Sequence, residues 1–146
     1  MADHFKHQLE IQVRFVDVDM MGHVNHVNYL SFVELARLKY FDDVLGTDTD
    51  WHIQHGLIMA RMEADYKSAI EYDDKVIVYT RCSKLGSKSF DLNWLITRMH
   101  NGAAETAAEG KTTIVCYDYQ SKKAIAIPPD RRLKIQQYEQ VETGLG

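Results

Sequence analysis

The chain has 146 residues, of which 45% are hydrophobic and 26% are charged, and its formal net charge is −4. This length suits one domain with a real core rather than two, so we expect residues 1–146 to form one domain. The slight acidity excludes a general electrostatic attraction to nucleic acid or to anionic membranes.

Neither a membrane span nor a signal peptide is expected. No apolar run approaches the length of a membrane span, and residues 1–6 lack an apolar stretch. The two cysteines, Cys82 and Cys116, lie in strand-like runs. Buried free thiols in a reducing compartment are therefore expected, and with them a cytoplasmic location.

The first half of the chain predicts one strand and one long helix, with a polar segment between them. The pattern favours a strand over Leu9–Phe15 and a helix over Asn28–Leu45, with Gly46 as the stop of the helix. Apolar residues occupy more than one face of this helix, so we expect it to be buried on several sides.

The second half predicts consecutive strands. From Ala60 to Tyr66 the side chains alternate as in a half-buried strand, and Asn101–Gly102 is the strongest hairpin signal in the chain. The remaining predicted elements are strands over Lys75–Leu85, Ser89–His100, Ala104–Tyr119 and Ala124–Pro128, and a short helix over Asp130–Tyr138. A curled antiparallel sheet of five to six strands around the long helix would bury both, so the expected fold class is α+β.

Residues 17–29 concentrate polar side chains between the predicted strand and the long helix. They hold two carboxylates, two histidines and two asparagines, namely Asp17, Asp19, His23, His26, Asn25 and Asn28. A helix N-terminus presents unpaired N–H donors, and a carboxylate beside them can act as base or nucleophile next to an oxyanion holder. Capping by Asp19 and Asn28 is the alternative. Capping alone does not require so many polar groups, so we expect a site here, with Asp17 in a structural role.

This segment resembles the 4-hydroxybenzoyl-CoA thioesterase family of hotdog-fold proteins. The resemblance rests on the order D-x-D-x-x-G-H-V-N-x-x-x-Y, followed by an apolar helix with Glu34 and Arg37, and continues in Tyr66–Lys67, Tyr72–Asp74 and Lys88–Phe90. It covers roughly residues 8–128. It implies a hotdog fold and a homodimer or homotetramer.

The resemblance also implies roles for four residues of the loop. Asp19 matches the catalytic carboxylate, which attacks the thioester carbonyl or activates a water. His26 matches the position whose backbone N–H polarises that carbonyl. His23 and Asn25 are supporting polar groups. In related acyl-thioesterases the His works with an Asn two residues before it, where this chain has Met21, so His23 either orients Asp19 or a water, or bonds the loop backbone.

The expected substrate-binding residues are Tyr29, Lys88 and Ser89. Lys88 matches a basic residue that contacts coenzyme A phosphates in the family, and nearby Arg81 and Lys84 favour a small anion-binding patch. A lysine that is merely solvated on a turn is the alternative.

Other chemistries find less support. His23 and His26 have a spacing that can bind zinc, but a catalytic zinc site needs three protein ligands, and no second motif supplies the third. No nucleophile elbow and no glycine-rich nucleotide motif is present. We therefore expect neither a metal nor a cofactor.

The expected function is hydrolysis of an acyl-CoA thioester to a free acid and coenzyme A. The alternatives are a thioesterase acting on acyl carrier protein and a non-catalytic acyl-CoA-binding module, and neither nucleic acid nor a membrane is an expected partner. The acyl group stays open. The residues that either line an acyl tunnel or simply form the core are Tyr29, Phe32, Phe41, Trp51, Leu57 and Met59.

Overall fold

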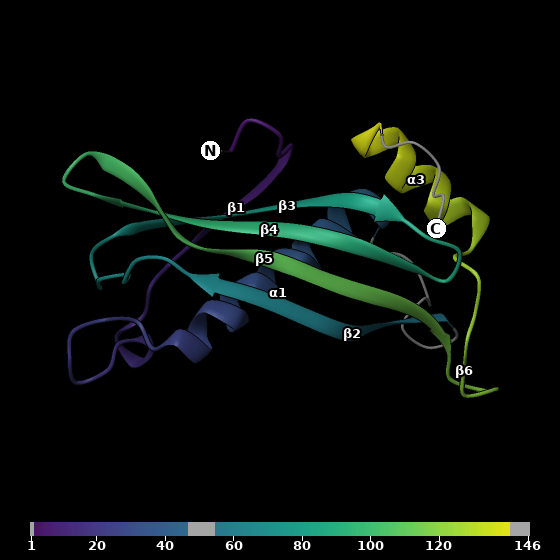
Figure 1. The fold of residues 1–146 in the computed structure, drawn as a ribbon, viewed down its shortest axis with the longest axis horizontal. Coiled ribbons are helices and arrows are strands. Elements are labelled where there is room, and N and C mark those ends of the chain that lie inside the picture. The colour runs from purple at the N-terminus through teal and green to yellow at the C-terminus, as the bar shows by residue number, and fades with distance from the viewer. Residues whose placement is uncertain (1, 47–54, 141–146) are drawn as a thin grey trace.

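One long helix lies across the concave face of a curved antiparallel sheet in the computed structural model, which describes residues 2–46 and 55–140 (Figure 1). The strand order is β1-β3-β4-β5-β2, and a short β6 pairs with β5. The strands are β1 (His7–Ile11), β2 (His55–Tyr66), β3 (Lys75–Leu85), β4 (Ser89–His100), β5 (Ala103–Asp118) and β6 (Lys123–Ala124). The predicted α+β class, with its curled sheet of five to six strands, is therefore confirmed.

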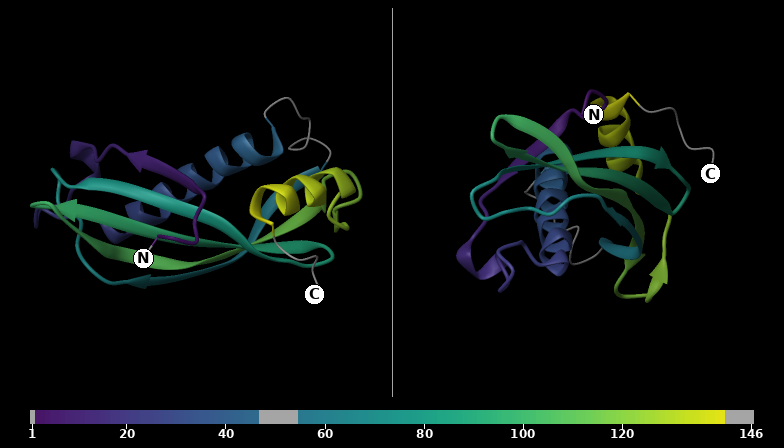
Figure 2. Two further views of the ribbon diagram at one scale, coloured as in Figure 1. Left: turned by 90° about the horizontal axis from the view of Figure 1, so that it is seen from above. Right: turned by 60° about the vertical axis from the view of Figure 1, so that its left-hand side comes forward.

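Helix α1 (His26–Leu45) is the element around which the sheet curls (Figure 2). Its apolar residues divide into two clusters against the sheet. Residues of the first turns, such as Tyr29, Phe32 and Val33, pack with Trp94 and Ile96 of β4. The second cluster, near the end of the helix, joins Tyr40, Phe41, Val44 and Leu45 to Phe90, Leu92 and Ile114, and Ile135 of helix α3 (Pro129–Glu139) completes it.

One face of α1 departs from the prediction. The sequence predicts a helix buried on several sides, but Leu35 and Leu38 are 53% and 48% exposed. The sheet covers only the face that carries the two clusters, and no described segment covers the side of these two leucines.

Three of the six predicted strands are right to within one residue at both ends, and the differences in the other three have local causes. Strand β1 ends at Ile11, which pairs with Val76 next to the first residue of β3, so residues 12–15 have no partner strand. Strand β2 begins at His55 because β5 pairs with it as far as Asp118, and a bulge between Met59 and Arg61 hides this continuity in the sequence pattern.

The C-terminal predictions are right in part. The predicted Ala124–Pro128 strand is reduced to β6, since Ile125 and Ile127 donate hydrogen bonds to the separate carbonyls of Cys116 and Ser87. The predicted terminal helix is confirmed as α3. The hairpin turn is also confirmed, because Asn101 and Gly102 both have positive φ, 52° and 80°.

Both cysteines are buried and unpaired, as predicted. Burial raises the pKa of the Cys82 thiol to about 12. The thiols are therefore components of the core rather than reactive groups. Among the described residues, no helix has the length and apolar character needed to cross a lipid bilayer.

Candidate functional site

The polar loop before α1 begins with an ion pair between the exposed Arg14 side chain and the buried Asp17 carboxylate. Asp17 closes a single 3₁₀ turn over Phe15–Asp17, and its carboxylate is 2% exposed. Arg14 donates to it from the backbone N–H (2.9 Å) and from Nη2 (2.8 Å). The hydrogen bond from the Arg14 side chain lowers the pKa of Asp17. Both oxygens of Asp17 are thus occupied, which agrees with the structural role expected for it.

Asp19 is presented differently. Its carboxylate is exposed, and its Oδ1 accepts hydrogen bonds from the backbone N–H groups of Met21 (2.9 Å) and His23 (3.4 Å). Gly22 makes this tight turn possible because its φ is +84°, a conformation that other residues adopt only with strain. The loop therefore orients one oxygen of Asp19 and leaves the other open to solvent.

Helix α1 starts two residues earlier than predicted. Asn25 is the N-cap and its Oδ1 accepts from the N–H of Val27 (2.9 Å), which makes His26 the first helical residue. The N–H of His26 has no intrahelical carbonyl to bond and lies at the positive end of the helix dipole. Asn28 is not the cap. Its Nδ2 donates to the Asp17 carbonyl (3.0 Å) and so fastens the helix to the loop.

Asp19, the N-cap Asn25 and residues of the first turn of α1 line one shallow hollow of about 380 Å³. Its lining residues are Val16, Asp17, Val18, Asp19, Asn25, Val27 and Asn28. The hollow joins an exposed carboxylate to the first turn of a helix. This geometry suits an electrophilic carbonyl whose oxygen points at the helix end. The carboxylate can attack the carbonyl carbon directly, or it can act as a general base for a water that attacks.

The two histidines of the loop have unlike surroundings. The His23 imidazole makes no hydrogen bond to any of the described residues, while its backbone pairs with Asp19 and with Glu71. The His26 ring stands edge-on to the Tyr66 ring at 5.8 Å between centroids. Neither histidine belongs to a group of metal-ligand atoms within the described parts of the chain.

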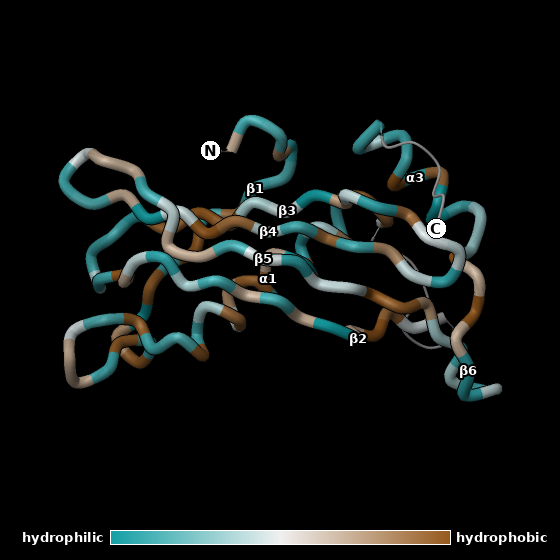
Figure 3. Tube along the Cα trace, viewed as in Figure 1, coloured by the Kyte–Doolittle hydropathy of each residue, from teal (hydrophilic) through white to brown (hydrophobic). Residues whose placement is uncertain are grey.

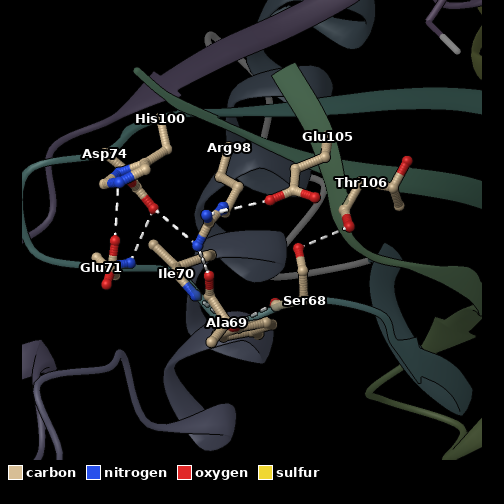
Figure 4. A network of polar contacts seen from close by, with 10 residues as sticks. Ser68, Ala69, Ile70, Glu71, Asp74, Arg98, His100, Glu105 and Thr106 are labelled. Atoms are coloured by element: carbon tan, nitrogen blue, oxygen red, sulfur yellow. Dashed lines mark hydrogen bonds and ion pairs between the residues drawn. The ribbon is translucent and has the colours of Figure 1, made fainter. Parts of the chain in front are cut away.

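A polar network around the buried Asp74 carboxylate adjoins this loop at Glu71 (Figure 4). The Asp74 carboxylate is fully buried. It accepts from the Glu71 N–H (2.8 Å), bonds the His100 Nδ1 (2.7 Å) and pairs with Arg98 (3.4 Å). Arg98 also donates to the Ala69 carbonyl. The network fixes residues 68–71 to the end of the β4–β5 hairpin.

Residues 68–71 in turn hold the loop and the helix. The N–H of Val24 donates to the Ile70 carbonyl (2.8 Å), and His23 forms a backbone bridge with Glu71. The Tyr29 hydroxyl donates to the Ser68 carbonyl (3.0 Å) and accepts from the Ile70 N–H (3.0 Å). Hydrogen bonds to residues 68–71 therefore hold both sides of the hollow, the loop and the start of α1.

The same network contains the one group of described side chains that could hold a cation. Ligand atoms of Glu71, Asp73, Asp74 and His100 lie within 4.8 Å of one another. Arg98 already supplies a positive charge to Asp74, which works against a divalent ion at the same carboxylate. Sequence reasoning missed this cluster, because Asp74 and His100 meet only through the β3–β4 register that pairs Lys75 with Met99.

The predicted substrate-binding residues do not lie together within one chain. The Tyr29 hydroxyl is occupied by backbone groups, as described above. Lys88 and Ser89 lie at the β3–β4 turn, at the opposite end of the sheet from the loop (Figure 1). The eleven residues of β3 separate the two ends by about 33 Å. Lys88 is exposed, and its carbonyl accepts from the Cys116 N–H (2.9 Å).

The predicted acyl-tunnel residues are mostly core. Tyr29, Phe32 and Phe41 are buried among other apolar side chains. Leu57 is half-buried and Met59 is exposed. Trp51 lies outside the described residues. Apolar side chains are instead exposed on the loop itself, namely Phe15, Val16, Met20 and Met21. Figure 3 shows hydrophobic stretches of the trace outside the sheet.

Comparison with known proteins gives a family match. The model of the thioesterase-like superfamily matches residues 13–135. The long-chain acyl-CoA thioesterase FadM of Escherichia coli is 29% identical over 133 residues, which covers 89% of this chain and 97% of FadM.

Solved structures agree with this match and with the predicted hotdog fold. A thioesterase of Thermus thermophilus, crystallised with coenzyme A and Zn, is 34% identical with a TM-score of 0.79, over 94% of this chain and 97% of that one. A 4-hydroxybenzoyl-CoA thioesterase variant bound to 4-hydroxybenzoyl-CoA superposes with the same TM-score of 0.79 at 18% identity, over 88% and 96%. The hotdog fold is confirmed.

The two aspartates of the loop should differ in their effect on stability. Asp17→Asn removes a buried charge from its ion pair, so we expect the melting temperature at pH 7 to fall by roughly 5 °C. Asp19→Asn, at an exposed carboxylate, should change it by less than about 2 °C. Thermal unfolding followed by circular dichroism measures both.

The pH dependence follows from the lowered pKa of Asp17. A lowered folded-state pKa stabilises the fold above the unfolded value of 3.8, and the effect is lost as the pH falls through the folded value. The difference between wild type and Asp17→Asn should therefore be full at pH 7 and shrink below pH 3.8. A difference that is constant down to pH 2 would contradict the ion-pair explanation.

Proposed function

The chain belongs to the thioesterase-like superfamily, and from that membership we propose that it is an acyl-CoA thioesterase in which Asp19 is the general base or nucleophile. One observation carries the assignment of Asp19. Asp19 and the first turn of α1 line the same hollow, and the Asp19 carboxylate is exposed. Both oxygens of the neighbouring Asp17, in contrast, accept hydrogen bonds from Arg14.

The reaction follows from this geometry. The thioester carbonyl oxygen points at the N–H of His26, where the helix end stabilises the charge that develops on oxygen. As a base, Asp19 takes a proton from water while the hydroxide adds to the carbonyl carbon. The tetrahedral intermediate collapses to the free acid, and the coenzyme A thiolate leaves and takes that proton back.

As a nucleophile, the Asp19 carboxylate adds to the carbonyl carbon itself. The thiolate leaves, and water then hydrolyses the mixed anhydride. In both routes Asn25 acts through the helix start that it caps, and His23 borders the turn that orients Asp19. Neither route uses a metal or a bound cofactor.

We further propose that the active form is a homo-oligomer with a site shared between copies. The outer edge of β2 has no strand partner among the described residues, and it is twelve residues long. Antiparallel pairing of two β2 edges about a two-fold axis would bring the far end of one sheet toward the near end of the other. This arrangement is what a role for Lys88 requires, because within one chain Lys88 and Asp19 are at opposite ends.

The proposed compartment is the cytoplasm. Two buried thiols that stay unpaired are compatible with a reducing environment.

The central test is Asp19→Asn. This change keeps the size of the side chain and removes its basicity, so kcat for an acyl-CoA should fall about a hundredfold or more, the scale of a lost catalytic base. Release of free thiol, detected with a thiol reagent, gives the rate. If Asp19→Asn turns over near the wild-type rate while a folded Asp17→Asn does not, the base is assigned to the wrong aspartate.

The proposed assembly can be tested at the β2 edge. Light scattering at micromolar concentration should give a multiple of the 16.9 kDa chain mass. Met59→Lys places a charge on this edge and should weaken the assembly and the activity together. Met99→Lys is the matched control, since Met99 on the inner strand β4 is 43% exposed and Met59 is 48% exposed. A stable, fully active monomer would remove the idea.

The role of Lys88 separates binding from chemistry. A phosphate contact is made equally in ground and transition states, so Lys88→Ala should raise KM about two- to fivefold and leave kcat nearly unchanged. The effect should shrink at high ionic strength. The same acyl group on a truncated pantetheine thioester is the control substrate and should show no change. An equal loss on both substrates would rule out the phosphate contact.

A further inference from the structure

A stripe of side chains runs along the uncovered face of α1. Asn28, Ser31, Leu35, Leu38 and Asp42 are spaced by three or four residues, so they lie one above another on the same side of the helix. The stripe starts polar, becomes apolar in the middle and ends in a carboxylate. Its two leucines are about half exposed, although neighbouring Phe32 is buried.

From Ser31 onward, this stripe forms one wall of a groove of about 690 Å³. Strand β1 supplies the opposite wall with Leu9 and Ile11, and Phe32 contributes to the lining between them. The remaining lining residues, mostly polar or charged, are Glu10, Gln12, Arg14, Asp17, Ser31, Lys39 and Asp42, together with Leu35 and Leu38. The volume falls within the range of small-molecule sites.

The groove adjoins the hollow of the candidate site. Asp17 lines both depressions, and Asn28, the first residue of the stripe, lines the hollow. The hydrogen bond from Asn28 Nδ2 to the Asp17 carbonyl lies where the two meet. A ligand with its carbonyl at the helix start can therefore extend along the stripe without crossing the core.

We propose that this groove binds the acyl chain of the thioester and that it selects an unbranched aliphatic chain of medium or greater length. The inference rests on the proposed function. From Ser31 to Asp42 the helix rises about 16 Å, a length that an acetyl group leaves empty and an extended chain fills. The chain would cover Leu35 and Leu38, whose exposure to water is otherwise unfavourable.

The charged far end of the groove limits the length of the acyl chain that it can bind. Lys39 and Asp42 line it, and Lys39 pairs with Asp43 at 3.2 Å. An apolar chain that reached these charges would desolvate them at a cost. Charged and polar side chains also flank the leucines on the β1 side, so the apolar strip is narrow. Cores of protein interfaces are depleted in charged residues, and this favours a chain-like ligand over a second copy of the protein.

The test compares dodecanoyl-CoA with acetyl-CoA. Leu35→Gln and Leu38→Gln keep the helix and the side-chain size but remove the apolar wall. Each should lower kcat/KM for dodecanoyl-CoA about tenfold and leave acetyl-CoA unchanged. Leu133→Gln is the matched control, because Leu133 on α3 is 53% exposed and lies outside the groove. It should change neither substrate.

A second variant blocks the groove instead of changing its polarity. Ser31 is exposed, and Ser31→Trp fills the space between the hollow and the leucines. Dodecanoyl-CoA turnover should fall by more than tenfold, while acetyl-CoA turnover stays. Equal losses on both substrates, or no loss on either, would overturn the proposal. So would a changed oligomeric mass with unchanged chain selectivity, which would make this face an interface between copies.

A binding measurement separates this proposal from the proposed function. If wild type hydrolyses neither substrate, the proposed function fails, and equilibrium dialysis of dodecanoyl-CoA still tests the groove. The Kd should rise about tenfold in Leu35→Gln relative to wild type and to Leu133→Gln. An unchanged Kd would remove the groove assignment independently of catalysis.

Discussion

The structure depends on the burial of one face of α1 against the concave side of the sheet. This contact removes a large apolar surface from water, from Tyr29 at the start of the helix to Leu45 at its end. It also fixes where the helix begins, and therefore where the N–H of His26 and the loop that carries Asp19 lie. A site built on a helix terminus is only as well placed as the helix, and here the helix is held along most of its length.

Backbone hydrogen bonds, more than contacts between side chains, fix the geometry of the hollow. Two backbone N–H groups of the loop orient Asp19. The loop is hydrogen-bonded to residues 68–71, and the network around Asp74 holds those residues in place. Both oxygens of the buried Asp74 carboxylate are paired, and such pairing rigidifies the segment that it holds. The network leaves one oxygen of Asp19 open to solvent, and this division between a fixed backbone and a free carboxylate is what a base or nucleophile needs.

The proposed acyl groove and the proposed coenzyme contact at Lys88 lie in different directions from Asp19. The groove leaves the hollow along α1, on the side of β1, whereas Lys88 lies beyond the far end of β3. In the proposed acyl groove, one chain holds the acyl group beside its own Asp19, while the proposed contact from Lys88 to the same ligand requires a second chain. The selectivity for the acyl group and the affinity for the coenzyme should then respond to different variants.

The sequence by itself determined the α+β class, most strand bounds and the Asn101–Gly102 turn, since these follow from local periodicity and turn chemistry. It also singled out the loop of Asp19, because polar residues there are dense and contiguous. Only the tertiary structure decided that Asp17 is paired with Arg14 and that His100 reaches Asp74. It also decided that Lys88 lies far from Asp19 within one chain. It alone showed that Leu35 and Leu38 are uncovered. Each of these depends on strand register or on which helix face the sheet covers, and burial is a property of packed elements that periodicity along one element does not specify.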